Sequence, residues 1–396
     1  MIKTQISIVL IGIGGYGDLY VSHLLDTNKQ KEASIVGVVD INPKMSKNYN
    51  KIIENHIPVF SSIEEFYENK KADLAVISTP IHLHAYQTCY ALTHGSNVLC
   101  EKPMCTTTQD ANKMINTRND MNKFLAIGFN WSFNPSVQEL KKDIRNGFFG
   151  KPKRLKTVLL WPRSRSYYNR APWVGRKYSE ESELILDSVA SNAGAHYLHH
   201  MFYLLGPTKE ESSCLNQVTA ELYRANPIEN FDTCALRAIT DEGVELLYYA
   251  THAVKNSVGP RFTFEFEHAT ITYTQEKGSN NVIAQFHDGR KKLYTDPRKE
   301  DPLQKLATCI EAIKLGNQDI YCGPEAAYTH TLCINSMHNS MPEIINFPEI
   351  LINHDEKTDL IWVDGLSETL IKCFEESRMP SEFDIPWARK GKLVNL

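Results

Sequence analysis

Hydrophobic and polar positions follow two different patterns along this chain, and the pattern changes near residue 128. Before that point, short and almost wholly apolar runs such as QISIVLIG and ADLAVIS are separated by segments with helical spacing. Apolar strands that alternate with helices are typical of a parallel sheet covered on both faces. We therefore expect residues 1–128 to form an α/β domain with a doubly wound parallel sheet.

After residue 128 the strand candidates become longer and alternate between apolar and polar residues, as in QVTAELYRA and RFTFEFEHATITYTQ. This period of two, with hairpin-type turns such as TDEG, predicts a large open, mainly antiparallel sheet. Two helical segments follow, over 301–316 and 324–340. We therefore expect residues 129–396 to form an α+β domain for substrate binding and oligomerisation, in which 341–396 is an appended C-terminal helix and tail.

Composition limits the function classes. A chain of 396 residues exceeds what one hydrophobic core usually supports, which agrees with two domains. The net charge of -4 gives no reason to expect nucleic acid or an anionic membrane surface as a partner. Nine dispersed cysteines without a C-x-x-C pair favour free thiols in a reducing compartment. Because the apolar run near the N-terminus is too short for a signal peptide or a membrane span, we expect a cytoplasmic protein.

The segment GIGGYG carries Gly12, Gly14 and Gly17 in a G-x-G-x-x-G pattern, between a predicted strand and a predicted helix. Asp40 ends the next strand. This arrangement brings backbone N–H groups to a pyrophosphate and a carboxylate to a ribose hydroxyl. The alternative is a tight turn in which the glycines serve only packing and Asp40 is a solvated loop residue. Asp40 would repel a 2′-phosphate, so NAD is favoured, while Lys44 leaves NADP possible.

The segment NVLCEKPM runs an apolar strand into Glu101, Lys102 and Pro103. Ligands of open parallel sheets bind at the carboxyl ends of the strands, and there a lysine could stabilise alkoxide-like charge during hydride transfer. Pro103 restricts Lys102 to extended backbone geometry, which aims its side chain. The alternative is a surface Glu–Lys pair that merely ends the strand.

Four segments together resemble the Gfo/Idh/MocA family of oxidoreductases. They are LIGIGGYG, VVD, ISTPIHLHAYQTCYALTHGSNVLCEKPM and NAGAHYLHHMFYLLG. The resemblance implies a Rossmann domain, a second domain on a large open sheet, and oxidation or reduction of sugars, cyclitols or related polyols with NAD(P). It also implies a catalytic Lys102 and a set of residues that hold or flank the dinucleotide. These are Gly12, Ile13, Gly14, Gly15, Tyr16, Gly17, Asp40, Thr79, Pro80, His84, Glu101, Lys102 and Asn130.

The segment DSVASNAGAHYLHH corresponds to the second part of the family's site. Members usually carry an Asp and, four residues later, a His, so that both share one helix face and can meet one substrate hydroxyl. Here His196 matches the histidine, but Asn192 stands where the Asp is expected. Asn can hydrogen-bond a hydroxyl but cannot take its proton.

Three explanations of this departure are open. His196 could act as the base together with Lys102, Asp187 could supply the missing charge, or the substrate could differ from simple polyols. His199 and His200 follow at helical spacing, but without an H-E-x-x-H motif or a second ligand cluster we expect no metal. The same holds for His82, which opens a helix rather than a ligand set.

The stretch WPRSRSYYNRAPWVGRKYS concentrates Arg, Tyr, Asn and Trp after a predicted strand. Aromatic faces with polar donors suit a hydroxylated ring, and arginines would favour a carboxylate. We expect the substrate to be bound by this stretch and by the catalytic groups, although an oligomer contact or a surface loop is the alternative. The predicted substrate-binding residues are Lys102, Arg163, Tyr167, Trp173, Asn192 and His196.

The sequence thus predicts an NAD-dependent oxidoreductase of a sugar, sugar acid or cyclitol, with Lys102 and His196 as acid–base groups and Asn192 as the orienting residue. One alternative uses transient oxidation to drive glycoside cleavage without net turnover of NAD. Another is a regulatory protein that binds NAD(P) or sugar without catalysis. The expected partners are a polyol or sugar and further copies of the chain, as a homodimer or homotetramer formed through the C-terminal sheet.

Overall fold

The computed structural model describes residues 5–26, 32–275 and 280–396. The chain forms two units, Met1–Phe133 with Asp301–Tyr328, and Asn134–Glu300 with Thr329–Leu396. The predicted boundary after residue 128 lies close to the first division. Nothing in the predicted boundaries anticipates the return of Asp301–Tyr328 to the first unit.

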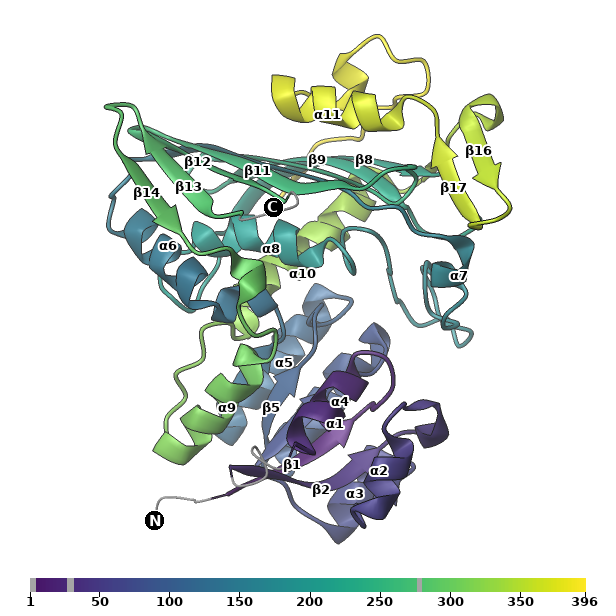
Figure 1. Ribbon diagram of the computed structural model, residues 1–396, viewed down its shortest axis with the longest axis vertical. Helices are drawn as coiled ribbons and strands as arrows, with labels where there is room; N and C mark the ends of the chain where they lie inside the picture. Colours follow the sequence, from purple (N-terminus) through teal and green to yellow (C-terminus); the bar gives the residue numbers. More distant parts are fainter. Residues whose placement is uncertain (1–4, 27–31, 276–279) are drawn as a thin grey trace. The chain divides into compact units, whose positions relative to one another are not determined.

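The first unit is built on a parallel sheet with the strand order β3-β2-β1-β4-β5-β6 (Figure 1). Its central strands are buried along their length, because helices cover both faces, as the apolar runs predict. The strands are β1 Ile6–Ile11, β2 Ala33–Val39, β3 Val59–Phe60, β4 Leu74–Ile77, β5 Asn97–Cys100 and β6 Leu125–Ile127. The helices are α1 Gly17–Leu24, α2 Tyr49–Glu54, α3 Ile63–Asn69, α4 His84–Thr93 and α5 Thr108–Met121.

Capping residues set where two of these helices begin. The Ser62 side chain accepts the N–H of Glu65 at the start of α3, and Thr107 does the same for Asp110 at the start of α5. From the returning segment, α9 (Gln304–Leu315) packs its buried face against β1 and against the short 3-10 turn η3 (Asn130–Phe133). Helix α9 is therefore part of the first unit, although it follows the strands of the second unit in the sequence.

The second unit is built on a large mixed sheet with the order β14-β13-β12-β11-β7-β10-β9-β8-β15, and β18 also pairs with β8. Most neighbours are antiparallel, as predicted, whereas β7 runs parallel to β10 and β15 to β8. The strands are β7 Pro152–Leu160, β8 Leu215–Arg224, β9 Thr233–Thr240, β10 Glu245–Thr251, β11 Val258–Phe266, β12 Ala269–Thr274, β13 Val282–Phe286, β14 Lys291–Tyr294, β15 Ile345–Asn346 and β18 Val394–Asn395.

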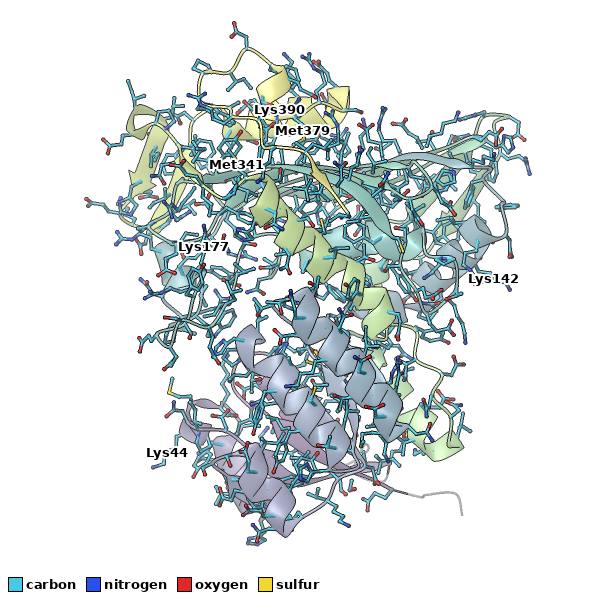
Figure 2. The ribbon with its side chains drawn as sticks, turned by 180° about the vertical axis from the view of Figure 1, so that it is seen from behind. Lys44, Lys142, Lys177, Met341, Met379 and Lys390 are labelled. Atoms are coloured by element: carbon cyan, nitrogen blue, oxygen red, sulfur yellow. The ribbon has the colours of Figure 1, made fainter. Side chains whose placement is uncertain are left out.

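Helices cover this sheet on both faces (Figure 1). On one face lie α6 (Pro135–Arg145) and α8 (Ala195–Leu204), and on the other α11 (Leu366–Glu376) packs on β7 and β10. Met379 belongs to the buried cluster under α11, and Figure 2 shows it in the same C-terminal segment as Lys390. The predicted C-terminal helix is thus present and covers part of the sheet.

Three further elements complete the chain. They are α7 (Arg165–Tyr168), the helix α10 (Pro324–Ser340), which crosses from the first unit into the second, and a small hairpin of β16 (Ile352–Asp355) and β17 (Leu360–Val363). None of the described helices has both the length and the apolar character needed to cross a membrane.

Candidate functional site

The glycine loop between β1 and α1 has room only for glycine at two positions. Gly12 has a φ of +81°, and a Cβ there would lie 2.9 Å from the carbonyl carbon of Ser78. A Cβ on Gly17 would lie 2.2 Å from the carbonyl oxygen of Gly12. A Cβ on Gly14 or Gly15 would meet no atom within 4 Å, so the loop backbone is open to a ligand at these positions. This is the shape that a pyrophosphate requires.

Asp40 lies directly after β2, beside this loop. Its Oδ2 accepts the N–H of Ile13 at 2.9 Å, and its Oδ1 accepts the N–H of Asn42 at 2.7 Å. The carboxylate is therefore fixed next to the loop, where it can accept ribose hydroxyls. Lys44 is exposed in the following turn and is labelled in Figure 2.

The E-K-P segment stands at the carboxyl end of β5, and β4 separates this strand from β1. The N–H of Glu101 continues the sheet by donating to the carbonyl of Ile77 at 2.8 Å. Glu101 is buried, Lys102 is half-buried, and the Lys102–Pro103 peptide bond is cis. The sheet thus places Lys102 at the same edge as the glycine loop.

The Glu101 carboxylate has partners that sequence reasoning missed. Its Oε1 accepts the hydroxyl of Tyr20 at 2.6 Å and pairs with the Lys305 ammonium of α9. Burial, followed by the negative charge of Glu101, raises the pKa of the Tyr20 hydroxyl well above its usual value, so the hydroxyl stays a donor. Contact between Glu101 and a ribose stays a prediction.

His84, at the start of α4, is 1% exposed and braces the E-K-P turn. Its Nδ1 lies 2.9 Å from the carbonyl oxygen of Pro103, and its Nε2 lies 2.9 Å from that of Thr79. Burial lowers the pKa of this imidazole. His84 thus ties the T-P-x-x-x-H segment to E-K-P, while contact of Thr79, Pro80 or His84 with a dinucleotide stays a prediction.

Asn130 adds a candidate ligand group next to the glycine loop. Its Nδ2 lies 3.4 Å from the Tyr16 hydroxyl, and its buried Oδ1 has no hydrogen-bond partner among the described residues. A buried acceptor left unsatisfied is costly unless a ligand or water supplies a donor. Together with the open loop and the fixed Asp40 carboxylate, this acceptor makes the first unit fit a bound dinucleotide.

In the second unit, only Asn192, Ala193 and His196 are incompletely buried within residues 185–204. Asn192 lies in a turn before α8 rather than in the helix, because Gly194 is the N-cap. A Cβ on Gly194 would lie 2.1 Å from the Tyr248 hydroxyl, so the close approach of this turn to the sheet requires glycine.

Asp187 is buried and holds the Asn192 side chain. Its Oδ1 accepts from Nδ2 of Asn192 at 2.9 Å, and its Oδ2 accepts the N–H of Gly175 at 2.6 Å. The amide is thereby oriented with its nitrogen toward Asp187. Sequence reasoning named Asp187 as a possible source of charge but could not show that it contacts Asn192.

The residues predicted to bind substrate after β7 form one cation–π cluster. The Arg163 guanidinium lies 5.0 Å from the Tyr167 ring centre, and the Arg170 guanidinium lies 3.7 Å from the same ring and 5.5 Å from that of Trp173. Beside this cluster is a cavity of about 630 Å³. Its lining consists of Tyr168, Asn169, Arg170, Ala171, Pro172, Val174, Gly175, Arg176, Pro227, Ile228 and Glu229.

The other histidines of α8 are packing residues. His199 and His200 are buried, and their rings lie beside Tyr203 and Phe262. Burial lowers the pKa of His199 well below its usual value and that of His200 to about 3. Among the described residues, no group of three His, Cys, Asp or Glu side chains could hold a metal ion.

Residues 6–129 match the model of the Gfo/Idh/MocA oxidoreductase family, described as an NAD-binding Rossmann fold. The chain is 24% identical over 265 residues to the levoglucosan dehydrogenase of Pseudarthrobacter phenanthrenivorans, covering 64% of this chain and 62% of that protein. It is 25% identical over 190 residues to the 2,7-anhydro-N-acetylneuraminate hydratase of Mediterraneibacter gnavus, covering 46% of each. The chain thus matches less than two thirds of the length of either relative.

A solved structure with a similar fold is the WlbA dehydrogenase of Bordetella pertussis, in complex with NADH and UDP-GlcNAcA. Its TM-score is 0.71 at 19% identity, and the match covers 86% of this chain and 97% of that chain. At this identity the likeness concerns the fold. It extends the comparison beyond residue 129 and agrees with the observed combination of a parallel sheet and a large mixed sheet.

Proposed function

Because residues 6–129 match the NAD-binding Rossmann model of the Gfo/Idh/MocA oxidoreductase family, we propose that the chain is an NAD-dependent oxidoreductase of a sugar, sugar acid or cyclitol. The observation that carries this proposal is the placement of the glycine loop, Asp40 and Lys102 after β1, β2 and β5 of one parallel sheet. A loop that can bind a dinucleotide and a cation that can contact the reacting oxygen thus lie at the same edge of the sheet. The dehydrogenase name of the levoglucosan relative supports the substrate class.

Each candidate residue has a proposed task. Bound NAD supplies the hydride acceptor or donor. Lys102 donates a hydrogen bond to the reacting oxygen and stabilises the negative charge that develops on it, and His196 is the partner acid–base group. Asn192 orients a substrate hydroxyl. Arg163, Tyr167 and Trp173, which belong to the cation–π cluster with Arg170, bind the ring of the substrate.

The contacts of Asp187 support one of the three explanations for Asn192. Both Asp187 oxygens already accept hydrogen bonds, and the residue is 3% exposed. A carboxylate used in this way is better suited to holding the Asn192 amide than to taking a proton from substrate. We therefore favour His196, with Lys102, as the acid–base pair.

The proposal is tested by screening polyols, sugars and sugar acids for NADH fluorescence with the full chain. For a substrate found in this way, we expect K102M to lower kcat by about 100-fold or more, while NADH binding is retained. K113M, on the exposed face of α5, is the matched control and should behave like the wild type.

A second comparison tests whether the two acid–base groups serve one step. If they do, the K102M/H196A double variant should lose much less activity than the product of the two single losses. Fully multiplicative losses would contradict a shared step. Failure of the wild-type chain to bind NADH would overturn the oxidoreductase proposal itself.

A second candidate is a reaction in which hydride is transferred from the substrate to the nicotinamide and later returned, so that NAD is not consumed. The hydratase name of one relative favours it, because addition of water is not a net oxidation. Asn192 in place of the usual acid also fits altered chemistry. Consumption of an anhydro-sugar or glycoside without NADH accumulation would identify this reaction, and accumulation of NADH in step with product would exclude it.

A further inference from the structure

A buried ion pair joins the E-K-P segment to the segment that returns to the first unit. It consists of Glu101 and Lys305, whose side chains are 8% and 0% exposed. Lys305 is in the first turn of α9, outside the residues matched by the family model. Glu101, which lies within the residues matched by the family model, is therefore in contact with Lys305, which lies outside them.

The Lys305 ammonium also approaches the glycine loop. It lies 4.6 Å from the ring centre of Tyr16, within the G-x-G-x-x-G segment, and 3.3 Å from the carbonyl oxygen of Gly128. The Tyr20 hydroxyl, from α1, donates to the same Glu101 oxygen that pairs with Lys305. One ammonium thus contacts both parts of the sheet edge that would hold the dinucleotide.

The position of the Glu101 carboxylate is restricted from a further side. A Cβ on Gly128 would lie 2.7 Å from Oε2 of Glu101, so the carboxylate packs against a position where only glycine leaves room for it. The same Oε2 lies 3.3 Å from the backbone nitrogen of Lys102. The direction of this carboxylate is therefore linked to the backbone of the proposed catalytic lysine.

Electrostatics explains why a lysine is required. A carboxylate removed from water without a cation nearby is strongly disfavoured, and removing one partner of a buried pair leaves such a charge. Without Lys305, the Glu101 carboxylate would either turn toward water or take up a proton, and both changes weaken the arrangement that holds it against Tyr20, Gly128 and Lys102. The glycine loop would at the same time lose the cation against the Tyr16 ring.

We propose that Lys305 is a positioning residue of the dinucleotide site, which acts through Glu101 and Tyr16 to hold the glycine loop and the E-K-P turn in their binding arrangement. The proposal deepens the proposed function and rests on it, because the dinucleotide is taken to be NAD. Affinity for NAD then depends on a helix that is distant in sequence from the fingerprint.

The test measures NADH binding by fluorescence titration of the full chain, independently of any substrate. K305M should weaken NADH binding by tenfold or more, and K305R should recover part of the affinity because it keeps the charge. K314M is the matched control: Lys314 is on the same helix and pairs with the exposed Glu32 at 3.3 Å. We expect K314M to bind NADH like the wild type.

A double-mutant cycle separates positioning from packing. If Lys305 acts in part through Glu101, K305M should weaken NADH binding clearly less in an E101Q background than in the wild type, because E101Q has already removed the buried carboxylate that Lys305 holds. Wild-type affinity in K305M, even with a lowered melting temperature, would overturn the proposal and leave Lys305 a purely structural residue. If the wild-type chain itself bound no NADH, both this proposal and the proposed function would be overturned.

Discussion

Asn192 is the side chain at which this chain departs from the acid usual in the resembling family, and its contacts explain why an amide suits the position. An amide presents a donor and an acceptor at once. The donor is used by the buried Asp187 carboxylate, which is itself fixed by the N–H of Gly175. In this pair the carboxylate therefore belongs to the buried Asp187, and residue 192 supplies the amide that it holds.

Restoring the family residue should therefore harm this protein. N192D would place two carboxylates at hydrogen-bond distance in a largely buried setting. We expect a loss of about 1–3 kcal/mol in the free energy of unfolding at pH 7, and no gain in activity. Because the neighbouring charge raises a carboxyl pKa, the loss should shrink as the pH falls and the pair takes up a proton. Urea denaturation at pH 7 and pH 5 measures both effects.

The exchanged variant D187N/N192D is the control. It keeps one carboxylate and one amide at the two positions, and the oxygen of the amide introduced at position 187 can still accept the N–H of Gly175. We expect its stability to lie closer to the wild type than that of N192D. Equal stability of N192D and the wild type at pH 7 would contradict the described contact.

At the scale of elements, α8 is unusual in having several histidines in a buried helix. His200 is 3% exposed, and its ring centre lies 5.8 Å from that of Phe262 in β11. Burial lowers its pKa to about 3, whereas a histidine in an unfolded chain has a pKa of about 6.5. The helix therefore carries a neutral imidazole in its core at neutral pH.

This burial predicts how stability depends on pH. Between pH 6.5 and 3 the unfolded chain binds a proton at His200 that the folded chain does not bind, so the free energy of unfolding falls as the pH falls. Below about pH 6.5, His200 lowers the free energy of unfolding by about 1.4 kcal/mol for each pH unit. Above that pH the stability is not reduced by this group. We expect H200F to have a shallower decline of stability between about pH 6 and pH 4.5 in urea denaturation. Parallel curves for the two proteins would contradict the buried neutral state.

At the scale of the molecule, the C-terminal segment supplies the cover for one face of the mixed sheet. The cluster beneath it includes Leu366, Leu370 and Phe374 of α11 with Leu247 and Tyr249 of β10. Beyond α11, the outward positions of β11 and β12 carry threonine, arginine and glutamate rather than apolar residues. Association through the sheet, as a homodimer or homotetramer, stays a prediction, and the face under α11 is not free for it.

Truncating one residue of this cover should be costly. Phe374 is 1% exposed, and the Lys156 ammonium and the Arg261 guanidinium lie 5.1 and 4.9 Å from its ring centre. We expect F374A to lower the free energy of unfolding by about 3–5 kcal/mol and to promote aggregation as the sheet face is uncovered. K372A, at an exposed position of the same helix, should change it by no more than about 0.5 kcal/mol. Urea denaturation and size-exclusion chromatography measure these effects.

Much of the fold could be predicted because local patterns carry it. The apolar runs that become β1, β4 and β5 are buried on both faces, and the alternating segments that become β11 to β13 alternate between buried and less buried positions. The segments that become β9 and β10 are instead buried over most of their length. The resemblance to an NAD-binding family is confirmed by the match over residues 6–129. The roles of the individual site residues stay predictions.

What the sequence by itself determined is therefore the type of the elements and the NAD-binding fingerprint, because strand periodicity and glycine geometry act over a few neighbouring residues. The tertiary structure alone decided which distant groups meet, such as Lys305 with Glu101, Asp187 with both Asn192 and Gly175, and α11 with β10. The physical reason is that a periodic pattern shows that a face is buried but not which segment covers it. A buried charge likewise requires a partner without marking where in the chain that partner lies.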